Sequence, residues 1–330
     1  MYIIAPQFIR DYITEKFSDV GKLSANGREF ILESIFVEKD WKRHMSINID
    51  SGLWQCFKTG RTGNFTSFYA HAENLSYFRA QRDLAIKNFD YLGEDIHIDE
   101  RPHAQLELDT SELYPITINS GNSNDPTMLD AWSFLFGRGL FNELYEEEEP
   151  FYLCKEGTFQ NRIIIPFTYL GTVFYYQGRS IYGEKPKYLN PSTEVAPKPS
   201  EILYPYDEEE DLLVVCEGPL DALSLHLRGI NATCTMGSSI SPTQAEMLST
   251  FKGTIIMGYD NDEAGQRGVD KFDRLRKERR MEPFEVCFPP SGHKDWNSAH
   301  IANFDLDSHI TRNSMEYNDD YRLRHLLEKL

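Results

Sequence analysis

Two acidic segments follow two short apolar runs, and this arrangement limits the possible folds more than any other feature. The apolar run 212–216 leads into the acidic segment 217–221, and the run 254–259 leads into the segment 260–263. Each run is followed by glycine or proline and then by a helical pattern, which predicts buried parallel strands. In open α/β sheets, ligands gather at the carboxyl ends of such strands. We therefore expect the two acidic segments to meet at one edge of a sheet.

Carboxylates that meet there repel one another, and burial raises the cost of their charges. A divalent cation relieves this repulsion, and ligands that offer only oxygen suit Mg²⁺ or Mn²⁺. We therefore predict that Glu217, Asp221, Asp260 and Asp262 hold Mg²⁺ or Mn²⁺. A single Asp-x-Asp can be no more than a turn or a helix cap. The presence of two acidic segments, each after a predicted strand, favours a metal site over a turn or helix cap.

The order of elements around these acids is also informative. A strand near 230–235 and a glycine loop follow the first acidic segment, and a helix opened by Ser241 comes next. The Asp-x-Asp segment and a final strand, 284–288, complete the series. This order resembles the Toprim domain, the metal-binding module of DnaG-like primases, topoisomerases and a group of nucleases. The family's acidic positions correspond to Glu217, Asp260 and Asp262, and a secondary acidic position corresponds to Asp221.

Further motifs resemble DnaG-like primases in the family's order, over roughly residues 130 to 300. They are an Arg-Gly-Leu helix end in 134–140, an Arg-led strand in 161–167, a Gly-Arg strand end in 171–179, a Lys-Tyr-Leu-Asn loop in 186–190 and Lys-Asp-Trp-Asn at 294–297. The last motif, with the Glu-Gly-Pro-Leu-Asp and Gln-Gly-Arg forms, resembles primases of T-even-type bacteriophages. The resemblance implies an α/β fold: a Toprim Rossmann-like parallel sheet, an α+β polymerase subdomain before it and a small zinc-ribbon-like β domain.

Basic and aromatic residues alternate just before the Toprim-like segment. Cations that neutralise phosphates beside aromatic faces that stack on bases are typical of a nucleic-acid groove. The alternative is an ordinary amphipathic sheet face whose Arg and Lys side chains extend to water. The predicted nucleotide or template contacts are Arg162, Arg179, Lys185, Lys187, Asn190, Lys294 and Asp295.

The formal net charge is −18 and the pI is about 4.9, which argues against simple nucleic-acid binding. The acid is concentrated in runs at 146–149 and 207–211, which flank the basic segment without interrupting it. Such runs are usually solvated linkers or partner-facing segments. We expect weak template binding that depends strongly on salt.

Length and cysteine usage give further limits. A chain of 330 residues should form two or three domains, and no apolar stretch is long enough to cross a membrane. The start of the chain lacks a basic, signal-like segment. The five cysteines contain no Cys-x-x-Cys, which indicates free thiols in a reducing compartment. We therefore expect a cytoplasmic protein, in the host cytoplasm if a phage encodes it.

The N-terminal third carries a fainter resemblance to the zinc-ribbon domain of primases. Residues 46–57 predict two strands joined by an Asp-Ser-Gly turn, and 58–65 is a glycine-rich loop before a helix. Cys56 matches one ligand position, but Thr59 stands at the next. The upstream segment 33–36 holds neither Cys nor His. Structural zinc needs four ligands, so we expect no zinc here.

Our hypothesis for this region is a metal-free ribbon with a DNA-facing loop. The aromatics expected to hold it are Trp41, Trp54, Phe57, Phe65 and Phe68, and the residues expected to face the template are Lys58 and Arg61. The alternative is that these aromatics are only core and the loop is only a turn.

The expected domains are a zinc-ribbon-like template-recognition domain at 1–85, a linker at 86–126, a polymerase subdomain at 127–206, a Toprim catalytic subdomain at 207–290 and a closing segment with a tail helix at 291–330.

The resemblance implies a DNA primase that makes short RNA primers on single-stranded DNA from ribonucleoside triphosphates. Glu217, Asp260 and Asp262 would be catalytic: the two aspartates hold the ion that binds the triphosphate, and Glu217 is a further ligand or activates the primer 3′-hydroxyl. No Gly-x-x-x-x-Gly-Lys-Ser/Thr loop occurs in these residues. We therefore expect a separate replicative helicase as partner.

Two other functions remain open. A Toprim nuclease would cleave phosphodiesters with the same metal ions and would need no nucleotide-binding basic segment. A non-catalytic replisome adaptor would tolerate loss of the acidic residues. A topoisomerase is excluded, because it needs an additional tyrosine-bearing gate domain.

Overall fold

The structure is a computed structural model of the chain. It describes residues 4–75, 77–88, 91, 113–141, 151–169, 172–205 and 210–327. The acidic run 146–149, most of the run 207–211 and the central part of the expected linker lie outside the described residues.

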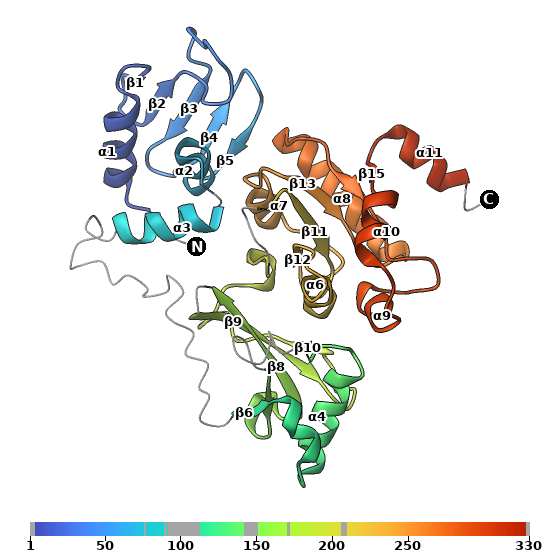
Figure 1. Cartoon of the computed structure of the whole chain (residues 1–330). Helices are drawn as coiled ribbons and strands as arrows, with labels where there is room; N and C mark the ends of the chain where they lie inside the picture. The colour runs from blue at the N-terminus through green and yellow to red at the C-terminus, as the bar shows by residue number, and fades with distance from the viewer. Residues whose placement is uncertain are drawn as a thin grey trace.

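The described residues form three five-stranded sheets, each with its own helices (Figure 1). Two sheets are antiparallel, and the third is parallel except for its last strand. This mixed α/β architecture confirms the fold class expected from the sequence. None of the described helices combines the length and apolar character needed to span a membrane.

The N-terminal unit is an antiparallel meander, in the order β1-β2-β3-β4-β5, with three helices. Its core includes Trp54, Phe65 and Phe68, as the sequence predicts. The other two aromatics proposed for this core are outside it, because Trp41 is 81% exposed and Phe57 is 64% exposed. Both lie in loops between strands, where no strand alternation assigns a side chain to the core. The elements are α1 (Pro6–Phe17), β1 (Gly21–Leu23), β2 (Glu29–Leu32), β3 (Met45–Asn48), β4 (Trp54–Cys56), β5 (Thr62–Gly63), α2 (Phe65–Glu73) and α3 (Tyr77–Lys87).

The middle unit is an antiparallel sheet in the order β10-β9-β8-β7-β6, covered by α4. The end of the expected linker differs from the prediction, because 113–116 forms β6 and pairs with β7. The glycine and proline residues of the segment predicted a linker, but a short edge strand forms among them. The elements are β6 (Leu113–Ile116), the 3₁₀ helix η3 (Ile118–Asn122), α4 (Pro126–Phe136), β7 (Phe151–Cys154), η4 (Gly157–Phe159), β8 (Arg162–Tyr169), β9 (Thr172–Ser180), β10 (Tyr188–Leu189) and η5 (Pro199–Glu201).

The third sheet has the order β12-β11-β13-β14-β15, with β11 and β13 as parallel neighbours near its centre. Apolar residues fill both faces of these strands, as expected for a sheet covered by helices on each side. The elements are β11 (Leu212–Cys216), α6 (Pro219–His226), β12 (Ala232–Cys234), α7 (Pro242–Leu248), β13 (Thr254–Met257), α8 (Glu263–Arg279) and β14 (Glu285–Val286).

The C-terminal segment packs on this same sheet. It consists of α9 (Trp296–Ile301), α10 (Leu306–Asn313), β15 (Met315–Glu316) and α11 (Asp319–Leu327). β15 pairs antiparallel with β14, and Tyr317 and Tyr321 join the core of the third unit. Arg322 of α11 donates to the buried Asp273 of α8 at 2.6 Å. The tail helix therefore docks on its own chain.

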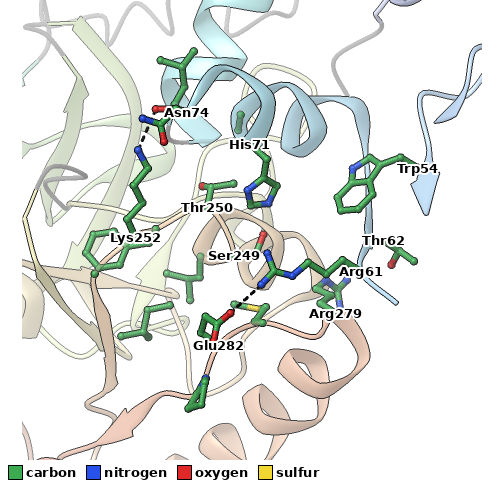
Figure 2. A pocket seen from close by; sticks show the side chains of 18 residues that line it. Trp54, Arg61, Thr62, His71, Asn74, Ser249, Thr250, Lys252, Arg279 and Glu282 are labelled. Atoms are coloured by element: carbon green, nitrogen blue, oxygen red, sulfur yellow. Dashed lines mark hydrogen bonds and ion pairs between the residues drawn. The ribbon is translucent and has the colours of Figure 1, made fainter. Parts of the chain in front are cut away.

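The N-terminal unit contacts the third unit directly. The backbone N–H of Tyr77 donates to Thr250 Oγ1 at 2.9 Å, and Lys252 Nζ donates to the Asn74 carbonyl at 3.2 Å. Between the units lies a pocket of about 330 Å³ (Figure 2). Arg61 and His71 enter it from the N-terminal side, and residues of α7, β13 and the end of α8 line the other side.

Candidate active site

The first acidic side chains of the two clusters meet at the carboxyl edge of the parallel sheet. β11 and β13 run side by side, with Val215 opposite Met257. Both chains therefore leave the sheet at the same edge. Glu217 follows β11, close enough to Asp260 for the charge of that residue to act on its carboxylate. Its Oε1 atom is buried and has no hydrogen-bond partner in the described part of the chain.

Asp262 stands at the first turn of the long helix α8. Its Oδ1 accepts hydrogen bonds from the backbone N–H groups of Ala264 and Gly265, at 2.8 and 2.9 Å, and so caps the helix. Gly265 is required by close packing, since a Cβ there would lie 2.1 Å from the Asp260 carbonyl oxygen. The capping geometry fixes the Asp-x-Asp turn beside Glu217.

Asp221 lies in the first turn of α6, and its Oδ1 accepts the backbone N–H of Asn297 at 3.0 Å. Asp295 caps α9 by accepting the Ser298 N–H at 2.8 Å. Both carboxylates are close enough to the acidic edge for their charges to act on it. The edge therefore gathers five acidic side chains: Glu217, Asp221, Asp260, Asp262 and Asp295.

The electrostatics of this edge are unfavourable for charged carboxylates. Burial, followed by the charges of Asp260 and Asp262, raises the pKa of Glu217 to about 7. Burial and the charge of Asp295 raise the pKa of Asp221 to about 7, although the Asn297 N–H opposes this. Burial and the same Asp295 raise the pKa of Asp260 to about 6, against the nearby Lys294. Clustered groups with such shifts mark functional sites more often than structural ones.

These residues fit a hard divalent cation. They offer only oxygen, they raise one another's pKa, and Glu217 keeps a buried oxygen without a partner. Over the residues that the structure describes, no three or more Asp, Glu, His or Cys side chains are already drawn together closely enough to hold an ion. The carboxylates thus influence one another through charge without a ready coordination geometry.

The Lys-Asp-Trp-Asn motif joins the acidic edge to the middle unit. Trp296 is fully buried, and its Nε1 donates to the Gly258 carbonyl at 2.7 Å, which holds the end of β13. Asn297 Nδ2 donates to the Arg138 carbonyl at 2.9 Å and to Ser224 Oγ at 2.8 Å. In return, Arg138 Nη1 donates to Asn297 Oδ1 at 2.8 Å.

Arg179 lies beside Arg138, since the guanidinium groups of both lie over the ring of Phe134. Its guanidinium lies over the rings of Phe134 and Tyr188, at 5.3 and 5.0 Å. Its Nε and Nη1 are buried without hydrogen-bond partners among the described residues. Burial lowers the pKa of Arg179, and the charge of Arg138 contributes to this. The charge of Asp221 contributes to the raised pKa of Tyr188. Arg138, Arg179 and the Tyr188 ring therefore lie beside the acidic residues.

The other predicted basic residues differ in their surroundings. Arg162 is only 4% exposed, and its Nη1 donates to the Gly178 carbonyl at 3.2 Å and the Lys187 carbonyl at 3.5 Å. It therefore supports β9 and the following loop. Lys185 and Lys187 are exposed on that loop. Asn190 Oδ1 accepts from Gln177 Nε2 at 2.8 Å.

In the N-terminal unit, Arg61 is engaged inside the chain. Its Nη2 donates to Glu282 Oε1 at 3.0 Å across the pocket in Figure 2, and its guanidinium lies 4.8 Å from the Phe36 ring. Burial, with the charge of Arg61, lowers the pKa of His71 in that pocket to about 4. Lys58 lies 3.7 Å from the buried Asp40.

Sequence reasoning missed two residues of the site, Arg138 and Asn297. Both lie within motifs that the sequence singles out, the Arg-Gly-Leu helix end and Lys-Asp-Trp-Asn, but only the first two residues of the latter were assigned to the site. The signal was present as two polar residues in otherwise apolar helix ends. Their pairing, 159 residues apart, is visible only in the structure.

Comparison with known proteins agrees with this geometry. The Toprim-like family model matches residues 214–300. The chain is 28% identical to the DNA primase of Clostridium acetobutylicum over 316 residues, which covers 82% of this chain and 51% of that protein. It is 26% identical to the DNA primase of Deinococcus radiodurans, over 68% of this chain and 45% of that protein. The chain thus spans about half the length of these relatives.

Two solved structures share the fold. The zinc-binding and RNA polymerase domains of the Aquifex aeolicus primase align with a TM-score of 0.54 and 22% identity, over all of this chain and 90% of that one. The E. coli primase catalytic core aligns with a TM-score of 0.50 and 19% identity, over 64% of this chain and 81% of that one.

The parallel sheet with acids at its carboxyl edge defines a protein with a Toprim domain. Beyond this domain, the chain is similar to bacterial DNA primases in sequence and shares the fold of their zinc-binding and RNA polymerase domains.

Proposed function

We propose that the chain is a DNA-dependent RNA primer synthase, which joins ribonucleoside triphosphates into short RNA on a single-stranded DNA template. The observation that carries this proposal is the acidic edge of the parallel sheet, joined through Asn297 to the cationic and aromatic surface around Arg138 and Arg179. A nuclease needs the acids alone. A polymerase also needs cations placed beside them for triphosphate and template.

The proposed ligands of a divalent ion, Mg²⁺ or Mn²⁺, are Glu217, Asp221, Asp260 and Asp262. When bound, such an ion stabilises the charge that develops on the attacking and leaving oxygens of an in-line phosphoryl transfer. Glu217 is also the proposed acceptor of the proton of the primer 3′-hydroxyl, because its buried Oε1 has no hydrogen-bond partner among the described residues. Asp260 and Asp262 then position the triphosphate opposite this hydroxyl.

Phosphate recognition falls to the neighbouring cations. The Nε and Nη1 atoms of Arg179 are buried and have no hydrogen-bond partners in the described part of the chain, and its guanidinium lies over two aromatic rings. An ordered, partly desolvated Arg suits phosphate oxygens. Lys185, Lys187, Asn190, Lys294 and Asp295 complete the proposed set. Arg162 supports the strand that carries Arg179.

Template contact in the N-terminal unit is proposed at a different place from the one that sequence suggested. Arg61 is held by Glu282, whereas Trp41 and Phe57 are exposed on neighbouring loops joined by the hydrogen bond from Phe57 N to the His44 carbonyl. Exposed aromatic faces beside cations such as Lys58 are suited to stacking with single-stranded bases. We include Trp41, Phe57 and Lys58 in the proposed template surface.

The proposed partners are a single-stranded DNA template, ribonucleoside triphosphates and a separate replicative helicase. Such a protein would act in the cytoplasm, where it meets replicating DNA. Because the net charge is −18, template affinity should be weak and should fall steeply with salt.

The test combines single-stranded DNA, all four ribonucleotides and Mg²⁺, with and without a candidate helicase, and resolves RNA products on a gel. Short RNA that depends on template, nucleotides and Mg²⁺ supports the proposal. Degradation of the DNA without use of nucleotides would show a nuclease. Helicase stimulation with no RNA, unchanged in the Asp260→Asn variant, would show an adaptor.

A further inference from the structure

The loops at one end of the N-terminal sheet are the place where a zinc ribbon would hold its metal. One loop, 33–44, joins β2 to β3, and the other, 57–61, joins β4 to β5. The similar Aquifex aeolicus structure includes a zinc-binding domain. In this chain, the surviving Cys56 donates its thiol to Ser34 Oγ at 3.2 Å, and both side chains are buried. A thiol already bonded to a hydroxyl, with Thr59 at the next ligand position, does not fit the four sulfur or imidazole ligands of structural zinc.

A carboxylate stands at the centre of these loops instead. Asp40 is 1% exposed. Its Oδ2 accepts the backbone N–H groups of Ser34, at 3.0 Å, and His44, at 2.8 Å. Its Oδ1 contacts His44 Nδ1 at 2.5 Å and lies 3.7 Å from Lys58 Nζ. Asp40 thus contacts the start and the end of the first loop and a side chain of the second.

The charge of Asp40 is compensated where it lies. Burial by itself would raise its pKa, but hydrogen bonds from the His44 ring, the His44 backbone and the Ser34 backbone outweigh burial and lower it to about 2. The second loop is tied to the same place, because Phe57 N donates to the His44 carbonyl at 2.6 Å and Cys56 bonds Ser34. A buried anion that has its donors is stable in a protein interior.

We propose that the Asp40 carboxylate replaces a metal ion as the centre that ties these two loops together. In a metal-bound ribbon, a central cation gathers electron-pair donors from both loops. Here the central charge is negative instead of positive: the Asp40 carboxylate accepts hydrogen bonds from N–H groups of the loop 33–44 and lies near Lys58 of the other loop. The proposal concerns how this unit folds, so it does not depend on the proposed function.

The first test uses the unmodified full-length chain. We expect elemental analysis of the purified protein to find far less than one zinc per chain. A high-affinity zinc chelator should leave the melting temperature and the rate of tryptic cleavage unchanged. About one zinc per chain, or unfolding of residues 29–63 on chelation as seen by hydrogen exchange, would overturn the proposal.

The second test compares Asp40→Asn with Asp50→Asn, an exposed aspartate of the same sheet. Loss of the charged acceptor should speed tryptic cleavage at Lys39, Lys42 and Arg43 by at least about tenfold and lower the melting temperature of this unit by about 5–10 °C. Asp50→Asn should change neither. Equal behaviour of the two variants would refute the role of Asp40.

His44→Gln keeps the proposal testable if Asp40→Asn does not fold. This variant removes the ring Nδ1 donor and leaves both backbone N–H groups in place. We expect a smaller increase in cleavage of the 33–44 loop than for Asp40→Asn, in the same direction. Cleavage at the unmodified rate would count against the Asp40 centre.

Discussion

Asp40 and Glu217 both carry buried carboxylate oxygens, but the two carboxylates have opposite surroundings. Asp40 has three hydrogen-bond donors and a nearby lysine, and its pKa is lowered to about 2. Glu217 has a buried oxygen that no described residue hydrogen-bonds, it lies among other acids, and its pKa is raised to about 7. These opposite surroundings mean that the charge of Asp40 stabilises the fold, whereas the charge of Glu217 destabilises it.

This contrast gives a physical criterion for function. A carboxylate held for structure is surrounded by donors, because an unpaired buried charge is costly. A cluster that keeps its charges unpaired destabilises the chain unless something else binds there. The acidic edge meets the second condition.

The largest effect should come from Asp260→Asn. Loss of one charged oxygen at the proposed metal site should lower primer synthesis by about 10²–10³-fold or more, measured as RNA formed per unit time with Mg²⁺. The fold should remain intact, because the charged form of Asp260 is unfavourable in its partly buried, acidic surroundings. EDTA should abolish synthesis by the unmodified chain, and added Mg²⁺ or Mn²⁺ should restore it.

The matched control is Glu263→Gln, one residue beyond Asp262 and strongly exposed. It should retain activity within about twofold, because a surface charge change at this distance is weak. A folded Asp260→Asn variant with full activity would refute the proposed site.

Glu217→Gln should raise stability in metal-free buffer, and the effect should depend on pH. The folded-state pKa of about 7 lies above the ordinary value of 4.5, so the folded chain binds a proton that the unfolded chain does not between these values. The unmodified chain therefore loses stability as pH rises through about 7. We expect the variant to melt roughly 2–4 °C higher at pH 8 and to show no advantage at pH 5.

The Asp40→Asn difference should have the opposite sign and another pH window. Because the folded pKa of about 2 lies below the ordinary 3.8, the stabilisation by Asp40 is complete above about pH 4 and is lost as pH falls through 2. Melting temperatures of both variants and the unmodified chain, measured from pH 2 to pH 8 in EDTA, test both pH windows. Parallel curves would remove the distinction between the two groups.

Asn297→Ala should have an intermediate effect. It removes the bonds to Arg138 and Ser224 and leaves buried polar groups unpaired, at about 1–3 kcal/mol. Residues that position a site in this way typically change activity by about 10–100-fold. We expect a fall in the turnover number for primer synthesis with a smaller change in nucleotide KM. Exposed Asn313, changed to Ala, is the control.

The smallest effect should follow from breaking the Arg61–Glu282 pair. Glu282 is 85% exposed, so Glu282→Gln should cost about 0.2–1 kcal/mol, decreasing with salt. Thermal melting at low and high ionic strength measures this. A loss of several kcal/mol would mean that the junction between the two units is held by this pair rather than by the buried contacts around it.

The parallel strands and the acids at their ends could be predicted from the sequence alone. The runs 212–216 and 255–257 are continuously apolar, which is typical of strands buried on both faces. The caps of α7 and α8 follow from Ser241 and Asp262, whose side chains bond to N–H groups two or three residues away. These features depend on nearby residues in the chain and on the rule that ligands bind at the carboxyl ends of parallel strands, so they can be derived without coordinates.

The pairing of distant polar side chains could not be predicted from the sequence and is visible only in the folded chain. Arg61 meets Glu282 across 221 positions, and Arg138 meets Asn297 across 159. The same holds for burial in loops: Trp41 and Phe57 point outward although aromatic residues are usually core, while Asp40 points inward although aspartate is usually exposed. Loop side chains have no period that assigns them to a face. Their direction is set by donors, acceptors and surfaces that the fold brings from elsewhere in the chain.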